Sequence, residues 1–252
     1  MLIQLTHAGK NYQCDLAQPI DIAIPAGQVK CFYATDFEAR PYVSGDFVGS
    51  VVAGAPVNFF DLQINPHGNG THTECLGHIT KQQELVNDHL QQFHFVAQVV
   101  SVALTKQPNG DQIITKTALQ TACPDTLPDA IIIRTLPNTT QKLTMDYSGT
   151  NPPYLEVAAV QFLVEAGIRH LLIDLPSVDR EVDEGKLLAH HLFWNVAAQA
   201  AKDNTRSDCT ITELIYVPDE VQDGLYLLNL QLPAIPLDAV PSKPTLYALF
   251  AV

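Results

Sequence analysis

Residues 130–175, AIIIRTLPNTTQKLTMDYSGTNPPYLEVAAVQFLVEAGIRHLLIDL, contain the pattern that decides the fold. The apolar run Ala130–Ile133 is typical of a strand that is buried on both faces of a sheet. Between Pro152-Pro153 and Gly167, apolar residues recur at helical spacing, which predicts an amphipathic helix over 154–166. A second apolar run over 168–175 follows directly and predicts another strand. The order strand, helix, strand indicates a mixed α/β fold.

The segments outside this stretch add mostly strands. The sequence predicts further strands over 93–104, 209–217, 224–232 and 246–252, and a second helix over 186–202. In the first sixty residues, apolar runs such as 20–24 and 51–60 are interrupted by Pro and Gly, which indicates strands and loops. No repeat, charge block or linker divides the chain. We therefore expect a strand-rich α/β protein with a single domain over residues 1–252.

Composition narrows the class of partner. The chain of 252 residues has a net charge of −13 and a hydrophobic share of 46%, so it can bury a core and repels phosphate backbones and anionic lipids. We expect a small-molecule substrate and no nucleic-acid or membrane partner. The N-terminus lacks the pattern of a signal peptide, which favours a cytoplasmic protein. The low charged fraction of 16% and the apolar closing segment LYALFAV favour a homo-oligomer.

Five of the nine histidines fall in two short windows. The first window, HGNGTHTECLGH, covers residues 67–78, and the second is the pair His190-His191. In an extended backbone His72 and Glu74 point to the same side, and glycines at 68 and 70 allow a turn that returns His67 toward them. Imidazole and carboxylate together suit zinc, manganese or iron. The simpler alternative is a polar loop whose histidines only make hydrogen bonds.

The pair His190-His191 and the acidic residue Glu213 add candidate ligands to the hypothesis of a metal site. Neighbouring residues of a helix point about 100° apart, so only one residue of the pair His190-His191 can face a common ion. Glu213 lies in an otherwise apolar strand-like run, where burying a carboxylate is unfavourable unless it is paired or binds a metal. His78 has the side chain suited to general acid–base catalysis near neutral pH.

The stretch 67–78 resembles the motif of the cyclase or kynurenine-formamidase-like metal-dependent hydrolases. That motif runs His, one residue, Gly-Thr-His, one residue, Asp, Ala-Pro, one residue, His, and this chain matches it in Gly70-Thr71-His72 and in the step from His72 to His78. Similarity also extends to 177–179, 189–191 and 211–213. The resemblance implies a swivelling β/β/α fold, a homodimer or homotetramer, and one or two divalent ions, zinc or manganese.

The resemblance also implies roles for individual residues. It gives His78 as the acid/base, and it gives five metal ligands: His67, His72, Glu74, His190 and Glu213. The implied activity is hydrolysis of an amide, formamide, cyclic imide or lactone by metal-activated water, similar to that of an arylformamidase. No separate organic cofactor is implied.

This chain departs from the family motif at three places. Two residues rather than one separate His67 from Gly70, Glu74 replaces Asp, and Cys75-Leu76-Gly77 replaces Ala-Pro and the following residue. The early tryptophan of some formamidases has no counterpart, because the sole tryptophan is Trp194. Two alternatives follow: a non-catalytic protein that binds a metal or small molecule in the same fold, and a thiol hydrolase with Cys75 as the nucleophile.

Overall fold

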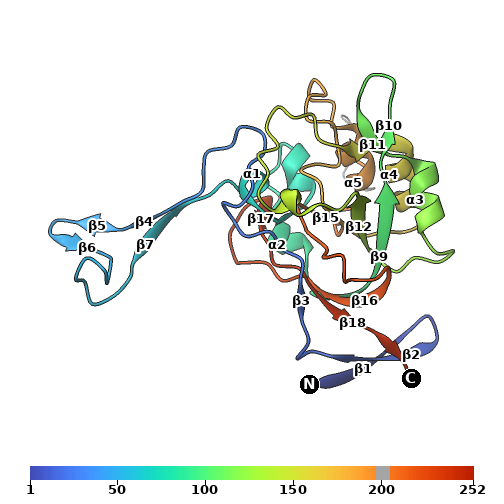
Figure 1. Ribbon diagram of the computed structural model, residues 1–252, viewed down its shortest axis with the longest axis horizontal. Helices are drawn as coiled ribbons and strands as arrows, with labels where there is room; N and C mark the ends of the chain where they lie inside the picture. The colour runs from blue at the N-terminus through green and yellow to red at the C-terminus, as the bar shows by residue number, and fades with distance from the viewer. Residues whose placement is uncertain (197–204) are drawn as a thin grey trace.

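A nine-stranded mixed sheet forms the centre of the computed structural model, which describes residues 1–196 and 205–252 (Figure 1). In spatial order, the strands of this sheet are β17 (Ala239–Pro241), β8 (His72–Glu74), β15 (Thr210–Glu213), β14 (His170–Ile173), β12 (Ala130–Leu136), β9 (His94–Ala103), β16 (Gly224–Asn229), β18 (Thr245–Ala248) and β3 (Ile20–Asp21). The four central strands β15, β14, β12 and β9 are parallel, and the outer strands pair antiparallel. This architecture confirms the prediction of a strand-rich α/β fold.

Strand β12 is buried on both faces of the sheet, as its apolar run predicts. Ile131 and Ile133 pack into one apolar cluster, and Ile132 packs into a second cluster on the opposite side. The first cluster includes residues of the three longer helices that cover this face of the sheet: α3 (Lys116–Ala122), α4 (Val157–Glu165) and α5 (Leu188–Trp194). Helix α4 connects β12 to its parallel neighbour β14, which is the predicted strand–helix–strand unit.

Several boundaries differ from the predictions for physical reasons. Helix α4 begins at Val157 rather than at residue 154, because Tyr154 and Leu155 form β13 (Tyr154–Leu155) and pair with β11 (Gln112–Ile114). The strand predicted over 246–252 is divided between β18 and β19 (Phe250–Ala251), which lie in different sheets. Helix α5 ends at Trp194, where Asn195 adopts a left-handed conformation, and positions 197–202 of the predicted helix lie outside the described residues.

Smaller elements complete the chain. Strands β1 (Leu2–His7), β2 (Lys10–Asp15) and β19 form one three-stranded sheet, and β10 (Thr105–Lys106), β11 and β13 form another. Two further helices, α1 (Pro66–Asn69) and α2 (Val86–His89), and the 3₁₀ turns η1 (Leu76–Ile79) and η2 (Thr140–Leu143) lie in connecting segments. None of the helices in the described part is long and apolar enough to cross a membrane.

A long hairpin, here called the arm (residues 38–63), projects from the rest of the chain (Figure 1). At its base β4 (Glu38–Pro41) pairs with β7 (Phe60–Gln63), and β5 (Val43–Ser44) pairs with β6 (Phe47–Val48) farther out. The apolar run 51–60 lies largely in exposed turns of this arm. Of the strands and loops expected in this part of the chain, residues 51–59 are loop and the strand begins at Phe60, because these side chains do not pack on the core of their own chain.

Candidate metal centre

Strand β8 places two predicted ligands side by side. His72 and Glu74 lie two residues apart on this strand, and both side chains are fully buried. β8 is held between β15 and β17, with His72 opposite Glu213 and Glu74 opposite Ala239. The alternation of an extended strand therefore directs both side chains to one site, as the sequence predicts.

The His72 ring leaves one nitrogen without a partner. Its Nδ1 lies 3.1 Å from the carbonyl of Gly70, and because a carbonyl can only accept, Nδ1 is the nitrogen that carries the proton in the neutral ring. Nε2 then presents a lone pair 3.5 Å from Glu213 Oε2, and this buried nitrogen has no hydrogen bond. Two acceptors that face each other in a buried site favour a cation between them.

The extra residue after His67 forms part of a short helical turn. Asn65 caps α1 by accepting a hydrogen bond from Gly68 N, with Pro66 at the first helical position. This turn directs the His67 ring back to β8, where Nδ1 lies 3.2 Å from Glu74 Oε2. The altered spacing in the motif therefore does not remove His67 from the cluster.

Helix α5 contributes His190 and turns His191 away. His190 Nδ1 lies 2.7 Å from Asp179 Oδ2, and its Nε2 lies 3.2 Å from Glu74 Oε1. Asp179 also accepts hydrogen bonds from the backbone N–H groups of Ala189 and His190, so it fixes both the helix start and the ring. His191 instead donates to the carbonyl of Val196. Of the pair, only His190 therefore faces the cluster around Glu74.

Glu213 completes the buried side of the centre. Its Oε1 accepts a hydrogen bond from Val178 N at 3.0 Å and lies 3.9 Å from His190 Nε2. The carboxylate is therefore buried with a backbone donor on one side and two imidazoles nearby, which meets the condition under which a buried carboxylate is tolerated.

His78 lies at the open side of the centre, together with an acidic residue that sequence reasoning missed. The side chain of His78 is 29% exposed, and its Nδ1 lies 3.6 Å from Asp238 Oδ2 and 3.8 Å from Glu74 Oε2. Asp238 Oδ2 is also 3.1 Å from His67 Nε2. Asp238 immediately precedes β17, and its only sequence signal is a single acidic residue in the apolar stretch 232–240.

Negative charge dominates this cluster. Burial alone lowers the pKa of His67, but the contacts with Asp238 and Glu74 raise it to about 10. Burial likewise opposes the charged form of His190, yet Asp179 and Glu74 raise its pKa to about 10. Burial favours neutral Glu74, but the nearby imidazoles of His78, His190 and His67 hold its pKa well below the ordinary range. The carboxylates thus stabilise positive charge here, whether it is held by protons or by a metal.

Two overlapping donor sets have the spacing needed for a metal ion. His67, Glu74 and His78 form one set, and His72, Glu74 and Glu213 form the other, with the donor atoms of each set within 4.8 Å of one another. Glu74 belongs to both sets, so one carboxylate can serve two ions. The mixture of imidazole and carboxylate donors, together with the unpartnered His72 Nε2, fits zinc or manganese.

A cavity of about 330 Å³ opens onto His67, His78 and Glu213 of these sets. Phe32, Ala34 and Leu187 supply apolar lining, and His67, His78, His190 and Glu213 lie along its polar side. Cys75 points elsewhere: it is fully buried in the core, and burial raises the pKa of its thiol to about 12. A protonated, buried thiol is not a nucleophile, so the structure argues against the thiol-hydrolase alternative.

Comparison with known proteins places this chain in a family. The sequence model of the family described as "Putative cyclase" matches residues 14–180. The chain belongs to this cyclase family. A search of curated proteins finds no match to the sequence.

The cyclase-family chain also shares its fold with solved structures of low sequence identity. A predicted metal-dependent hydrolase from Bacillus stearothermophilus aligns with a TM-score of 0.61 and 14% identity, over 91% of this chain and 98% of its own. Isatin hydrolase A from Labrenzia aggregata, bound to benzyl benzoate, aligns with a TM-score of 0.65 and 14% identity, over 92% and 96%. A structure described as a novel cyclase aligns with a TM-score of 0.65 and 15% identity, over 92% and 89%. These similarities support the strand-rich α/β fold along most of the chain.

Proposed function

We propose that this protein is a metal-dependent hydrolase. Its substrate is a small compound with an amide, formamide, cyclic imide or lactone bond, and its reaction is similar to that of an arylformamidase. The observation that carries the proposal is the unpartnered lone pair of His72 Nε2 opposite Glu213, within a cluster of three further imidazoles and Glu74. Two of the structural relatives support the proposal of hydrolase activity, because they are named as a predicted metal-dependent hydrolase and an isatin hydrolase.

The proposed ligands are His67, His72, Glu74, His190 and Glu213, which would hold one or two zinc or manganese ions. When bound, such an ion lowers the pKa of a bound water toward about 7 and polarises a carbonyl oxygen. Asp179 holds the His190 ring through Nδ1, so that Nε2 faces the centre. This arrangement fixes both the tautomer and the direction of the ring.

His78 has the position expected of the proton donor. It lines the cavity and is partly exposed, and its Nδ1 faces Asp238. Its other ring nitrogen is then available to deliver a proton to the leaving nitrogen or oxygen. Such a group contributes roughly 10² to 10⁴ in rate. The apolar wall formed by Phe32, Ala34 and Leu187 suits the ring or aryl part of a small substrate.

Hydrolysis of a compound panel by metal-loaded and chelator-treated protein tests this proposal. The panel contains a formanilide, a cyclic imide, isatin and an aryl lactone, and turnover is expected to disappear on chelation and to return with zinc or manganese. Turnover that persists fully without metal would contradict the metal mechanism. Tight metal binding without hydrolysis of any member would instead identify a binding protein that shares the fold.

A further inference from the structure

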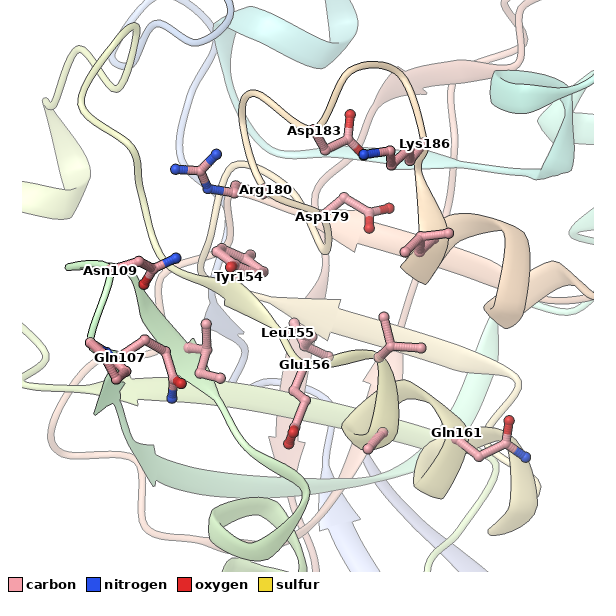
Figure 2. A pocket seen from close by; sticks show the side chains of 15 residues that line it. Gln107, Asn109, Tyr154, Leu155, Glu156, Gln161, Asp179, Arg180, Asp183 and Lys186 are labelled. Carbon is pink, nitrogen blue, oxygen red and sulfur yellow. The ribbon is translucent and has the colours of Figure 1, made fainter.

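Arg180 lies where two cavities of the chain meet. One is the cavity of about 330 Å³ at the candidate metal centre, and the other is a neighbouring groove of about 880 Å³ (Figure 2). Arg180 and Asp183 line both of them. Among the described residues that line the metal cavity, Arg180 is the only arginine or lysine. A ligand that extends from the centre toward the groove therefore meets this cation.

The backbone keeps Arg180 close to the candidate centre. Two residues before it, the N–H of Val178 donates a hydrogen bond to Glu213. The residue directly before it, Asp179, holds the His190 ring. Consecutive Cα atoms lie about 3.8 Å apart, so the loop that carries Arg180 begins at the centre itself. The Arg180 side chain is 40% exposed, and Figure 2 shows it at the border of the groove that this loop forms.

A buried carboxylate fixes the guanidinium of Arg180. Asp111 is 2% exposed, and its two oxygens accept hydrogen bonds from Arg180 Nε at 3.0 Å and from Nη2 at 3.3 Å. Three neutral side chains also donate to this carboxylate: Asn109, Asn151 and Tyr154. The hydrogen bonds from Asn151 and Tyr154 lower the pKa of Asp111 to about 2, so the group is ionised at neutral pH. The planar fork of Arg180 is therefore oriented before any ligand arrives.

Part of the guanidinium remains free to bind an anion. Besides its two bonds to Asp111, Arg180 donates from Nη1 to the carbonyl of Val182 at 2.9 Å. A guanidinium has five N–H groups. Two of them, one on each terminal nitrogen, therefore have no partner among the described residues. Two N–H groups on neighbouring nitrogens suit the two oxygens of a carboxylate.

This cation stands out in a chain that repels anions. The net charge is −13, which opposes the approach of a negatively charged ligand. Two acidic residues of the cavity rim, Glu181 and Asp183, accept hydrogen bonds from backbone N–H groups of the surrounding loops. Their carboxylates are thus engaged in holding the rim, whereas Arg180 has donors left over. Apart from a metal ion, Arg180 is the partner that the cavity offers to an anionic group.

We propose that Arg180 binds a carboxylate of the substrate, which is a small carbonyl compound that also carries this anionic group. The hydrolysable bond lies at the metal centre and the carboxylate at the junction of the two cavities. A larger remainder of the substrate extends into the groove along Leu155, Val157 and Leu188. This assignment of a substrate class rests on the proposed function, but the contact between Arg180 and a carboxylate can be measured without turnover.

Calorimetry with ligands that are not hydrolysed tests the contact. Benzoate and the three benzenedicarboxylates are titrated into zinc-loaded protein, since one carboxylate can bind the metal ion and the second is left for Arg180. At least one dicarboxylate is expected to bind the wild type roughly tenfold or more tightly than benzoate. Arg180→Gln should lose this advantage, whereas Lys186→Gln, which removes a cation that lines only the groove, should keep it.

The ratio of the two affinities separates anion binding from a structural role of Arg180. A loosened loop would weaken the binding of benzoate and dicarboxylate alike and leave their ratio unchanged. Arg180→Lys keeps the positive charge beside Asp111 and should retain part of the advantage. If the chain takes up no zinc, benzoate binding that is lost in Arg180→Gln but kept in Lys186→Gln still supports the contact.

Kinetics connect the contact to the reaction. Metal-loaded protein is given formanilide and the three formamidobenzoates, which add a carboxylate to the same ring. Arg180→Gln should raise KM for at least one formamidobenzoate roughly tenfold or more, with kcat nearly unchanged and both constants for formanilide unaffected.

Three results would overturn the proposal: equal affinity of the wild type for benzoate and every dicarboxylate, equal losses in Arg180→Gln and Lys186→Gln, or an unchanged KM for every formamidobenzoate in Arg180→Gln. If no compound is hydrolysed, the proposed function fails, while calorimetry still decides whether Arg180 binds a carboxylate.

Discussion

His72 Nε2 and Glu213 Oε2 lie 3.5 Å apart on neighbouring antiparallel strands, and in the neutral His72 ring neither atom can donate a hydrogen to the other. The register that pairs these two residues brings together side chains 141 positions apart in the sequence. A buried contact of this kind is stable only with a cation nearby. The sheet itself therefore builds the inner half of the candidate metal centre.

Metal content provides the first test. We expect purified protein to contain one to two equivalents of zinc or manganese per chain, and His72→Ala to lose more metal affinity than any other single histidine substitution. The reason is that His72 is fully buried between Glu74 and Glu213. Elemental analysis after dialysis against each metal measures this, with His7→Ala as a control. A wild type that neither contains nor rebinds transition metal would falsify the assignment.

The second prediction separates the role of His78 from that of Glu74. His78→Ala should retain the metal held by His72, Glu74 and Glu213, a set that does not include His78, and lose roughly 10² to 10⁴ in kcat. Glu74→Ala should lose both metal and turnover, because both donor sets include Glu74. The loss in kcat of His78→Ala should be larger for amides than for activated esters, because the departure of a poorer leaving group depends more on its protonation. Wild-type rates for metal-loaded His78→Ala on a cyclic amide would show that His78 is not the acid/base.

Asp179 allows a test of ring orientation. Asp179→Asn removes the charged partner of His190 Nδ1 and should weaken metal binding roughly 10- to 100-fold, which is typical for such supporting carboxylates. Asp183→Asn is the control, because Asp183 lies in the same loop and its side chain, among the described residues, accepts hydrogen bonds from the backbone N–H groups of Gly185 and Leu187 rather than from His190. Competition with a fluorescent zinc chelator gives both affinities, and equal losses in the two variants would contradict the role of Asp179.

His170 should make stability depend on pH. Burial lowers its pKa to about 4, below the value of about 6.5 in an unfolded chain. The unfolded state therefore binds a proton first as pH falls, so this contribution to stability is present above pH 6.5 and is lost between about 6.5 and 4. The loss is on the order of 3 kcal/mol.

Urea unfolding at pH 7.5 and 4.5 measures this loss. His170→Gln should show a smaller difference between the two pH values than the wild type, and His94→Gln, at an exposed position, should show the same difference as the wild type. An unchanged pH dependence in His170→Gln would mean that other groups cause it.

Local sequence patterns predict the centre of the fold and the residues of β8 in the candidate site, for identifiable reasons. The apolar run Ala130–Ile133 is a signal within one strand, and the pair His72 and Glu74 depends only on alternation within another. Asp238 could not be predicted, because it reaches His67 and His78 through pairing between β17 and β8, which are far apart in the sequence. The pattern of the run 51–60 indicated strands and loops without dividing them, because apolar composition does not reveal whether a segment packs on the core of its own chain.

The donor atoms of the candidate centre come from segments that a ribosome produces at very different times. His67, His72, Glu74 and His78 emerge early, whereas Glu213 and Asp238 follow only after well over a hundred further residues. At about 5 to 20 residues per second, several seconds of synthesis separate the two groups. A nascent chain therefore displays four candidate donors before the strands that complete the centre exist. If the centre binds metal as proposed, we expect tight binding only after the sheet is complete, and ribosome-bound chains that stop before residue 205 should release zinc far more readily than the full-length protein.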